Sequence, residues 1–316
     1  MLITPASLQF LFNTFDLRLQ QGYTMAESFY NDIAMTVPSN SEQNVYGWIG
    51  KLPKMREWLG ERYLNNPAAR SYTLANKTYE DTIKIPREKI EDDQYGLYMG
   101  SVEMLGQEAK ILPDRLIAAL LDNGDSASGT CFDGQPMYST AHPTDPDNPS
   151  GTTQSNLKTA FPLTFANVAI ARSQMRQFTG EDGLPLGIKP THLIVPTQLE
   201  EAANQICNAE FVGPTTNFGA NGQLTQTNTL KGKLKPIVCE WLSQASSTTQ
   251  GTWYLVDASK PVKPFIWQMR RPLMSTYLNN LTDQNVFMRK EFIYGVDERV
   301  AAGYGLWFQS MKCIPV

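Results

Sequence analysis

The chain has 316 residues, of which 41% are hydrophobic and only 18% are charged, and its net charge is −4. The charged share lies below the roughly 25% typical of soluble domains, and the Asn, Gln, Thr and Ser that replace it make a surface easier to desolvate against other subunits. The short basic groups at residues 51–56, 231–235 and 270–271 are expected to be solvated strand and turn positions, so a sequence-reading DNA-binding protein is excluded.

The four cysteines are widely scattered and include no Cys-x-x-Cys pair, which argues against a zinc knuckle or a redox motif. We expect Cys207 and Cys239 to be small core residues. The first residues lack the basic and apolar regions of a secretory signal, and no apolar run approaches the roughly 18 residues that would span a membrane. We therefore expect an intracellular chain that is soluble at synthesis and has no membrane partner.

Residues 1–45 are expected to form an N-terminal arm without a wide apolar face. One modest helix is predicted over residues 25–35, between turn-forming sequences at 20–23 and 38–41. Segments of this kind usually pack on something else or remain mobile. An extended loop region over residues 46–90 follows, and it begins with an amphipathic segment bounded by Trp48 and Trp58.

Residues 72–85 alternate between apolar and polar side chains, which predicts two β-strands with a turn near residues 75–77. An isolated two-stranded hairpin is marginal in water, and this one is too polar to pack on its own domain. We therefore predict that it lies on a neighbouring subunit. The residues assigned to that contact are Tyr72, Leu74, Asn76, Lys77, Tyr79, Glu80 and Ile83.

A helical stripe then recurs at steps of three and four residues, which predicts one long helix over residues 91–123. The residues of this stripe are Tyr95, Tyr98, Val102, Leu105, Ala109, Leu112, Leu116 and Leu120. Glu91, Asp92 and Asp93 would begin the helix, where its dipole favours negative charge. Pro113 lies inside the pattern and should kink the helix or split it in two.

The remaining sequence predicts a short helix, a buried strand and a strand-rich final third. The helix covers residues 164–178 and the strand 191–196, and Thr197 with Glu200 matches a capping box that would open a further helix. Residues 144–153 and 210–230 read as loops. The last strands are expected at 236–242, 252–258, 262–269, 286–294 and 300–314. The expected fold class is α+β with antiparallel sheets.

The two histidines are the first candidates for a catalytic site. His192 precedes a buried strand and is expected to be structural. His142 has Cys131, Asp133 and Ser139 nearby in the sequence, so a Cys/His or Ser/His/Asp site is conceivable. There is no Gly-x-Ser-x-Gly nucleophile elbow, however, and a turn-stabilising histidine before a proline is favoured. We assign no catalytic residue, cofactor site or metal site, and expect no enzyme.

Several sequence segments, taken in order, resemble the Mu-like phage major head subunit (gpT) family. The most distinctive is Trp48-Ile-Gly-Lys-Leu-Pro-Lys-Met-Arg-Glu-Trp58. The others are residues 13–15, 22–24, 72–77, 82–85, 90–93, 132–139, 141–143, 189–196, 253–255 and 263–266. Each segment alone is weak, but their order is specific and the resemblance covers nearly the whole chain.

This resemblance implies the Hong Kong 97-like capsid fold of tailed phages. Residues 1–45 would be the N-terminal arm, 46–90 the extended loop, and 91–160 a peripheral domain whose spine helix is 91–123. Residues 161–285 would be mainly the axial domain, and the strands in 286–316 would return to the peripheral domain. The spine-helix residues would include Tyr95, Tyr98, Val102, Leu105, Leu112 and Leu116.

The resemblance also implies a function in assembly. Copies of a major capsid protein would form hexamers and pentamers of an icosahedral shell that encloses double-stranded DNA without sequence-specific binding. The protein would reside in the virion capsid, and in the host cytoplasm during assembly. Expected partners are a separate scaffolding protein or protease, because the arm is too short for a fused scaffold, together with a portal and, in some phages, a decoration protein.

Three alternatives stay open at this point: an encapsulin-like nanocompartment shell, a hydrolase that uses Cys131 or Ser139 with His142, and a tail or portal component. Autocatalytic crosslinking through Lys77 and Asn279 or Asn280 is not expected, because no Glu–Lys–Asn motif can be placed.

Overall fold

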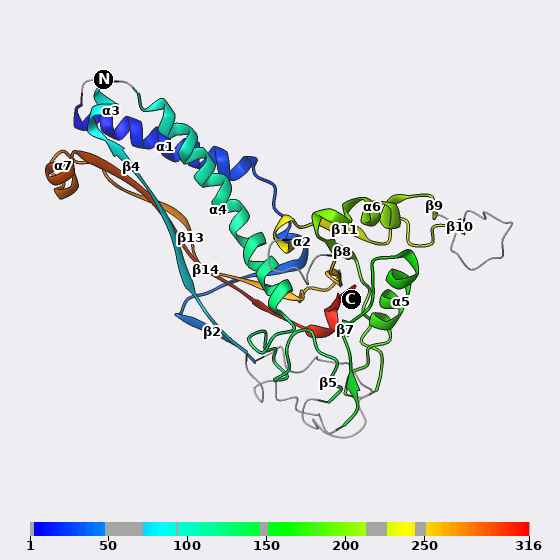
Figure 1. Ribbon diagram of the computed structural model, residues 1–316. Helices are drawn as coiled ribbons and strands as arrows, with labels where there is room; N and C mark the ends of the chain where they lie inside the picture. Colours follow the sequence, from blue (N-terminus) through cyan, green and yellow to red (C-terminus); the bar gives the residue numbers. More distant parts are fainter. Residues whose placement is uncertain are drawn as a thin grey trace.

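The computed structural model describes residues 3–47, 72–92, 94–145, 151–181, 183–212, 226–243 and 251–315. These residues form an elongated body and a more compact lobe, and helix α4 (Gly96–Asn123) runs from the far end of the body to the lobe (Figure 1). The two-tryptophan segment, and with it much of the predicted extended loop, lies outside the described residues. None of the described helices combines the length and apolar character needed to cross a membrane.

The body is built on a long, mixed four-stranded sheet in the order β1-β13-β14-β4. Strand β1 (Ala34–Pro38) runs parallel to β13 (Phe265–Leu278), which pairs antiparallel with β14 (Glu291–Tyr304). Strand β4 (Lys77–Pro86) pairs with β14 over its whole length, from Lys77 opposite Val300 to Pro86 opposite Glu291. The parallel pairing of β1 corrects the expectation of purely antiparallel sheets.

Helices α1 (Pro5–Met25) and α4 cover one face of this sheet. Their apolar sides and the sheet share one core, which consists of Leu8, Leu11, Phe12, Phe15, Leu19, Ile85, Ile90, Val102, Leu105, Val286, Phe292, Tyr294 and Val296. Helix α1 begins at a capping box, in which the Thr4 side chain accepts from the Ser7 amide and the Ser7 hydroxyl accepts from the Thr4 amide.

The prediction that the N-terminal arm has no wide apolar face is therefore wrong for residues 5–25. Helix α1 places Leu8, Leu11, Phe12, Phe15 and Leu19 at steps of three and four residues on one buried face. The predicted helix over 25–35 is wrong as well, because α1 ends at Met25 and only the short helix α2 (Tyr30–Ile33) precedes β1.

Two glycines let α1 and α4 approach each other closely. A methyl group added at Gly22 would lie 1.9 Å from the Glu103 carbonyl oxygen, and one at Gly106 would lie 2.2 Å from the Leu19 carbonyl oxygen. Neither oxygen can move away, because both belong to helical backbone. The two helices can therefore cross this closely only with glycine at both positions.

The predicted hairpin over residues 72–85 does not form. Strand β3 (Tyr72–Ala75) pairs antiparallel with β2 (Gln43–Tyr46), whereas β4 pairs with β14. The alternating pattern correctly indicated extended chain, but the chain continues past Asn76 instead of turning back. The long partner strand β14 comes more than 200 residues later, and the local pattern carried no information about it.

The long predicted helix is confirmed as α4, with corrections at its start and its middle. It begins at Gly96, and Glu91 ends the preceding short helix α3 (Arg87–Glu91), so α4 has no acidic residue in its first turn. Pro113 does not split the helix. Val102 and Leu105 are buried, whereas Tyr95, Tyr98, Leu112 and Leu116 are partly buried. Tyr95 is the N-cap residue.

The lobe contains a five-stranded sheet in the order β11-β8-β12-β15-β7. Its strands are β11 (Lys235–Val238), β8 (His192–Val195), β12 (Trp253–Val256), β15 (Ser310–Cys313) and β7 (Leu157–Lys158). Helices α5 (Phe165–Arg176) and α6 (Glu200–Asn208) contribute Val168, Met175, Ala203 and Ile206 to its core. The predictions of α5, β8 and β12 are confirmed. The final strand β15 pairs with β12 and β7, whereas β14 belongs to the long sheet.

Short elements complete the described chain. They are β5 (His142–Pro143), β6 (Thr153–Gln154), η3 (Thr197–Leu199), β9 (Phe211–Val212), β10 (Gln226–Thr227), η4 (Glu240–Ser243), α7 (Gln284–Arg289) and η5 (Trp307–Gln309). The predicted capping box at Thr197 is wrong, because a 3-10 turn precedes α6 and no side chain caps either helix.

Candidate assembly surfaces

Helix α7 lies at the far tip of the β13–β14 ribbon (Figure 1), and four exposed apolar side chains lie in this helix and in the segment before it. We call this set the tip patch. Its members, with their exposed fractions, are Leu278 (46%), Leu281 (38%), Phe287 (85%) and Met288 (67%).

Helix α7 is held in place by its buried side. Val286 packs into the core under α1, and the Asn285 side-chain amide donates to the Glu291 carbonyl oxygen at 2.6 Å. The next two side chains, Phe287 and Met288, consequently project into solvent. Clustered exposed hydrophobic side chains of this size mark interaction surfaces more often than isolated ones do.

A second exposed apolar set lies on the long helices. Phe10 and Leu17 are 74% and 71% exposed on α1, and Leu97 and Met104 are 79% and 66% exposed on α4. The seven-residue spacing within each pair corresponds to two helical turns, so both members lie on one side of their helix. The elongated body therefore presents apolar surface along its helical layer as well as at its tip.

The residues assigned to the hairpin contact are used largely within the subunit. Tyr72, Leu74, Tyr79 and Ile83 are half-buried against the chain's own cores.

Asn76 at the β3–β4 junction is also used within the subunit. Its amide group donates to Ser39 Oγ at 2.9 Å, and its carbonyl oxygen accepts from Gln268 Nε2 at 2.7 Å. Lys77 and Glu80 remain exposed on β4, which is an edge strand of the long sheet. The role of all seven residues in contacts between subunits stays a prediction.

A cavity of about 360 Å³ separates α4 from the sheet beneath it and is rich in carboxylates. Glu298 lies on the buried face of β14 and is 7% exposed, and its Oε1 atom has no hydrogen-bond partner among the described residues. Burial raises the pKa of this carboxyl to about 7. The other charged residues that line the cavity are Glu80, Asp81, Glu108, Arg115 and Asp297.

Lys312 is a buried cation of the lobe with two polar partners. Lys312 is 2% exposed, and its ammonium donates to the Asp122 carbonyl oxygen at 2.9 Å and pairs with Asp125 at 3.0 Å. The rings of Tyr138 and Tyr254 lie 5.9 Å from it. Burial raises the pKa of the Asp122 carboxyl to about 6, although Lys312 opposes this shift. This network ties the end of α4 to β15.

The structure brings His142 and Asp133 together, but inside the protein. His142 Nδ1 lies 2.6 Å from Asp133 Oδ2, both side chains have no exposed surface, and the imidazole stacks on Trp307 at 4.1 Å. Cys131 is buried as well, its thiol donates to the Gly305 carbonyl oxygen, and burial raises the pKa of that thiol well above its ordinary value.

Asn156 fixes the same region through backbone groups. Its side-chain amide donates to the carbonyl oxygens of Met137, Trp307 and Ser310, and its oxygen accepts from the Ser139 amide. A dissolved substrate has no open route to this histidine, and a thiol held in its protonated form is a poor nucleophile. The geometry therefore describes a structural histidine, in line with the turn-stabilising role that the sequence favoured.

The family model of the Mu-like prophage major head subunit gpT matches residues 8–162, 158–242 and 243–313. The chain belongs to this family. The expectation of a major capsid protein that forms the shell of a tailed-phage head is confirmed.

Individual gpT-family relatives agree. The chain is 30% identical to the major capsid protein of Escherichia phage Mu, over 77% of this chain and 100% of that protein. It is 27% identical to the FluMu major head subunit of Haemophilus influenzae, over 96% of this chain and 72% of that protein. It also resembles a chain of the procapsid of bacteriophage JBD30, with 27% identity and a TM-score of 0.58, over 99% of this chain and 76% of that chain.

These similarities confirm the α+β, Hong Kong 97-like capsid fold that the sequence predicts. As a gpT-family member the protein is a component of the virion capsid, and formation of a shell implies homo-oligomeric capsomers. The division into arm, extended loop, peripheral and axial domains is not tested by these comparisons and stays a prediction.

Two features of the assembly surfaces were not predicted from the sequence. The apolar stripe of α1 was readable from Leu8, Leu11, Phe12, Phe15 and Leu19, whose spacing is that of an amphipathic helix. The tip patch offered no such signal. Phe287 and Met288 belong to a six-residue helix, and only the tertiary structure shows that they face solvent.

Proposed function

We propose that copies of this chain associate into hexamers and pentamers and then close an icosahedral shell around double-stranded DNA. The observation that carries this proposal is the tip patch, an apolar surface at the end of a long β-ribbon and remote from the compact lobe. A monomer gains nothing from exposing Phe287 and Met288 there, because their burial requires another molecule. We assign a second copy of this chain as that molecule.

The elongated shape supports a shell built from many modest contacts. The tip patch, the α1–α4 helical surface and the β4 edge lie on different parts of the body, so one subunit can engage several neighbours at once (Figure 1). Simultaneous contacts multiply weak affinities into a stable assembly. The seven residues assigned from the sequence, between Tyr72 and Ile83, are proposed to contribute as well. Lys77 and Glu80 would do so through exposed charged side chains, and the other five through the parts of their side chains that the subunit leaves exposed.

Negative-stain electron microscopy of Phe287→Asp tests this proposal. The substitution puts a charge into the tip patch, so the variant should remain folded by circular dichroism and should form few or no closed particles. Thr282→Asp is the matched control, since it adds the same charge beside α7 at an exposed position without removing apolar surface. Normal shells from Phe287→Asp would rule out the tip patch as an assembly contact.

The remaining expectations belong to the same proposal. The subunit would use a separate scaffolding protein or protease, meet a portal and, in some phages, a decoration protein, and assemble in the host cytoplasm. Its enclosed DNA would be held without sequence-specific contacts. We propose no enzymatic activity, since the His142 and Asp133 side chains are buried and burial raises the pKa of the Cys131 thiol.

The encapsulin-like alternative is not favoured, because the family match is to phage head subunits. Nuclease-protected DNA inside particles made in phage-producing cells would separate the two functions, since an encapsulin-like shell would hold protein cargo instead.

A further inference from the structure

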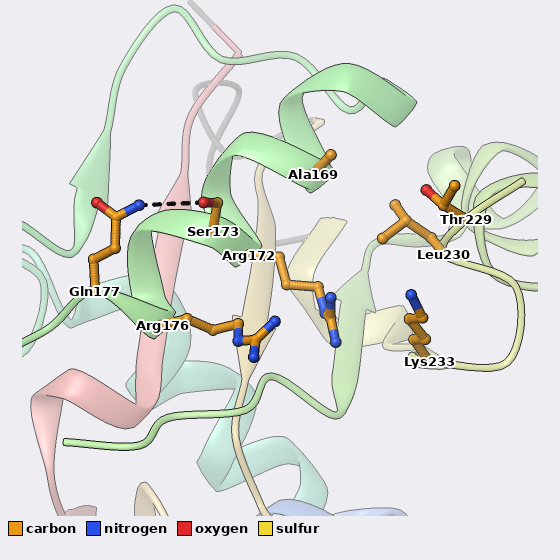
Figure 2. Close-up of a pocket in the computed structure, with 8 residues that line it drawn as sticks. All are labelled: Ala169, Arg172, Ser173, Arg176, Gln177, Thr229, Leu230 and Lys233. Carbon is orange, nitrogen blue, oxygen red and sulfur yellow. Dashed lines mark hydrogen bonds between the residues drawn. The ribbon is translucent and has the colours of Figure 1, made fainter. Parts of the chain in front are cut away.

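The lobe contains a polar pocket between helix α5 and the segment that leads into β11. Its volume is about 430 Å³, and the polar side chains that line it are Arg172, Ser173, Arg176, Gln177, Thr229 and Lys233. Figure 2 shows Arg172 extending from α5 toward the opposite wall, and Lys233 extending back from that wall toward the arginine. Three cationic groups therefore line one hollow, and none of the carboxylates in the described parts of the chain does.

None of these three cations forms an ion pair with any described residue, although their neighbours do. Lys231 pairs with Glu210 at 3.9 Å, and Lys235 pairs with Asp32 at 2.5 Å. Lys233 lies between those two lysines and faces the pocket instead. Gly232, whose φ is +69°, supplies the turn that separates it from Lys231. Two of the three lysines in this segment thus pair with carboxylates of the same subunit, and the third faces the pocket.

Arg172 is the least easily explained of the three groups. Its Nε atom is buried and has no hydrogen-bond partner in the described chain. Burial and the nearby charge of Arg176 both lower the pKa of Arg172.

The two arginines are four residues apart on α5, where like charges destabilise a helix. Arg176 lies in the last turn, where the helix dipole favours a cation. Arg172 has no such compensation.

We propose that this pocket binds a phosphate group, supplied either by the backbone of DNA or by a free polyphosphate. Guanidinium groups match phosphate oxygens with two parallel hydrogen bonds, and an ammonium adds a point charge. The hydroxyls of Ser173 and Thr229 and the amide of Gln177 provide neutral donors around them. The pocket has room for more than one phosphate. This inference goes beyond the shell function and does not depend on it.

Isothermal titration calorimetry with sodium tripolyphosphate tests the site in the full-length chain at constant ionic strength. We expect binding by the unchanged protein, and affinity at least tenfold weaker in Arg172→Gln and in Lys233→Gln. Lys233 is exposed, so its variant should fold even if Arg172→Gln does not. The matched control Lys231→Gln removes a charge from the same turn outside the pocket and should bind within about twofold of the unchanged protein. No binding by the unchanged protein, or binding by both pocket variants that is as tight as that of the unchanged protein, would overturn the proposal.

A 12-base-pair duplex distinguishes the two sources of phosphate. If tripolyphosphate displaces the duplex, and each pocket variant lowers the salt-dependence slope by about 1, the site takes the DNA backbone. If tripolyphosphate binds and the duplex does not, the source is a free polyphosphate. If neither binds but Lys233→Gln particles assemble wrongly, an acidic segment of another copy occupies the pocket and the phosphate proposal fails. The shell function would survive that last outcome.

Discussion

Replacing Glu298 by Gln should stabilise the protein at neutral pH and leave its stability unchanged in acid. Glu298 alternates with Val296 and Val300 on the buried face of β14, beneath α4. A carboxylate there loses its hydration and gains no described partner for Oε1, so the folded protein keeps the proton. Its pKa rises from an ordinary 4.5 to about 7.

The sign and size of the effect follow from that shift. Below pH 4.5 the carboxyl is protonated in both the folded and unfolded chains and contributes nothing. Between 4.5 and about 7 the unfolded chain loses its proton while the folded chain retains it, so the free energy of unfolding falls as pH rises. At ~1.36 kcal/mol for each pH unit between 4.5 and about 7, the effect amounts to roughly 3 kcal/mol, and it is fully expressed above pH 7.

Urea unfolding followed by tryptophan fluorescence between pH 4 and pH 8 measures this effect. The difference in unfolding free energy between Glu298→Gln and the unchanged protein should grow from near zero to about 3 kcal/mol across that range. Taking the difference between the two proteins cancels the contributions of other groups that titrate in this range, including Asp122. Glu80→Gln, at an exposed position lining the same cavity, should differ by less than about 0.5 kcal/mol throughout. A Glu298→Gln difference that does not change with pH would refute the reasoning.

Three further substitutions or measurements test other parts of the structure. Gly106→Ala should destabilise the fold by about 1–3 kcal/mol, because its methyl would meet the Leu19 carbonyl, whereas Gly100→Ala on the open side of α4 should be neutral or stabilising in the same thermal melt. Lys312→Ala should cost about 1–3 kcal/mol by removing the buried donor to the Asp122 carbonyl and the partner of Asp125, and Lys84→Ala, whose ammonium is largely exposed, less than about 1 kcal/mol; equal losses in denaturant titrations would contradict this. All four cysteines are buried, and burial raises the pKa of each thiol, so Ellman's reagent should label none in native protein and four after denaturation; rapid native labelling of Cys131 would revive the hydrolase hypothesis.

The sequence predicted those parts of the fold that depend on local periodicity. The α4 stripe, helix α5 with its Thr164 cap and the buried strand β8 all carry enough pattern within their own residues. Pairing partners were harder to predict, because the alternation of residues 72–85 fits either a hairpin or two strands with distant partners. The structure selects the second, since β14 provides ten consecutive residues of backbone pairing for β4.

Exposure could not be read from the sequence either. The basic groups at Lys231, Lys233 and Lys235 look equivalent in one dimension, and only the fold separates the two that meet carboxylates from the one that faces a pocket. The same limit applies to Phe287, which a local pattern places in a core as readily as on a surface. The family resemblance predicted the fold and the function despite this limit, but it did not predict which individual side chains are exposed.

Shell formation itself is tested most directly by negative-stain electron microscopy of the purified full-length protein, alone and coexpressed with its neighbouring phage genes. The account predicts closed shells or capsomer rosettes in at least the coexpressed sample. A monodisperse monomer under both conditions would contradict it.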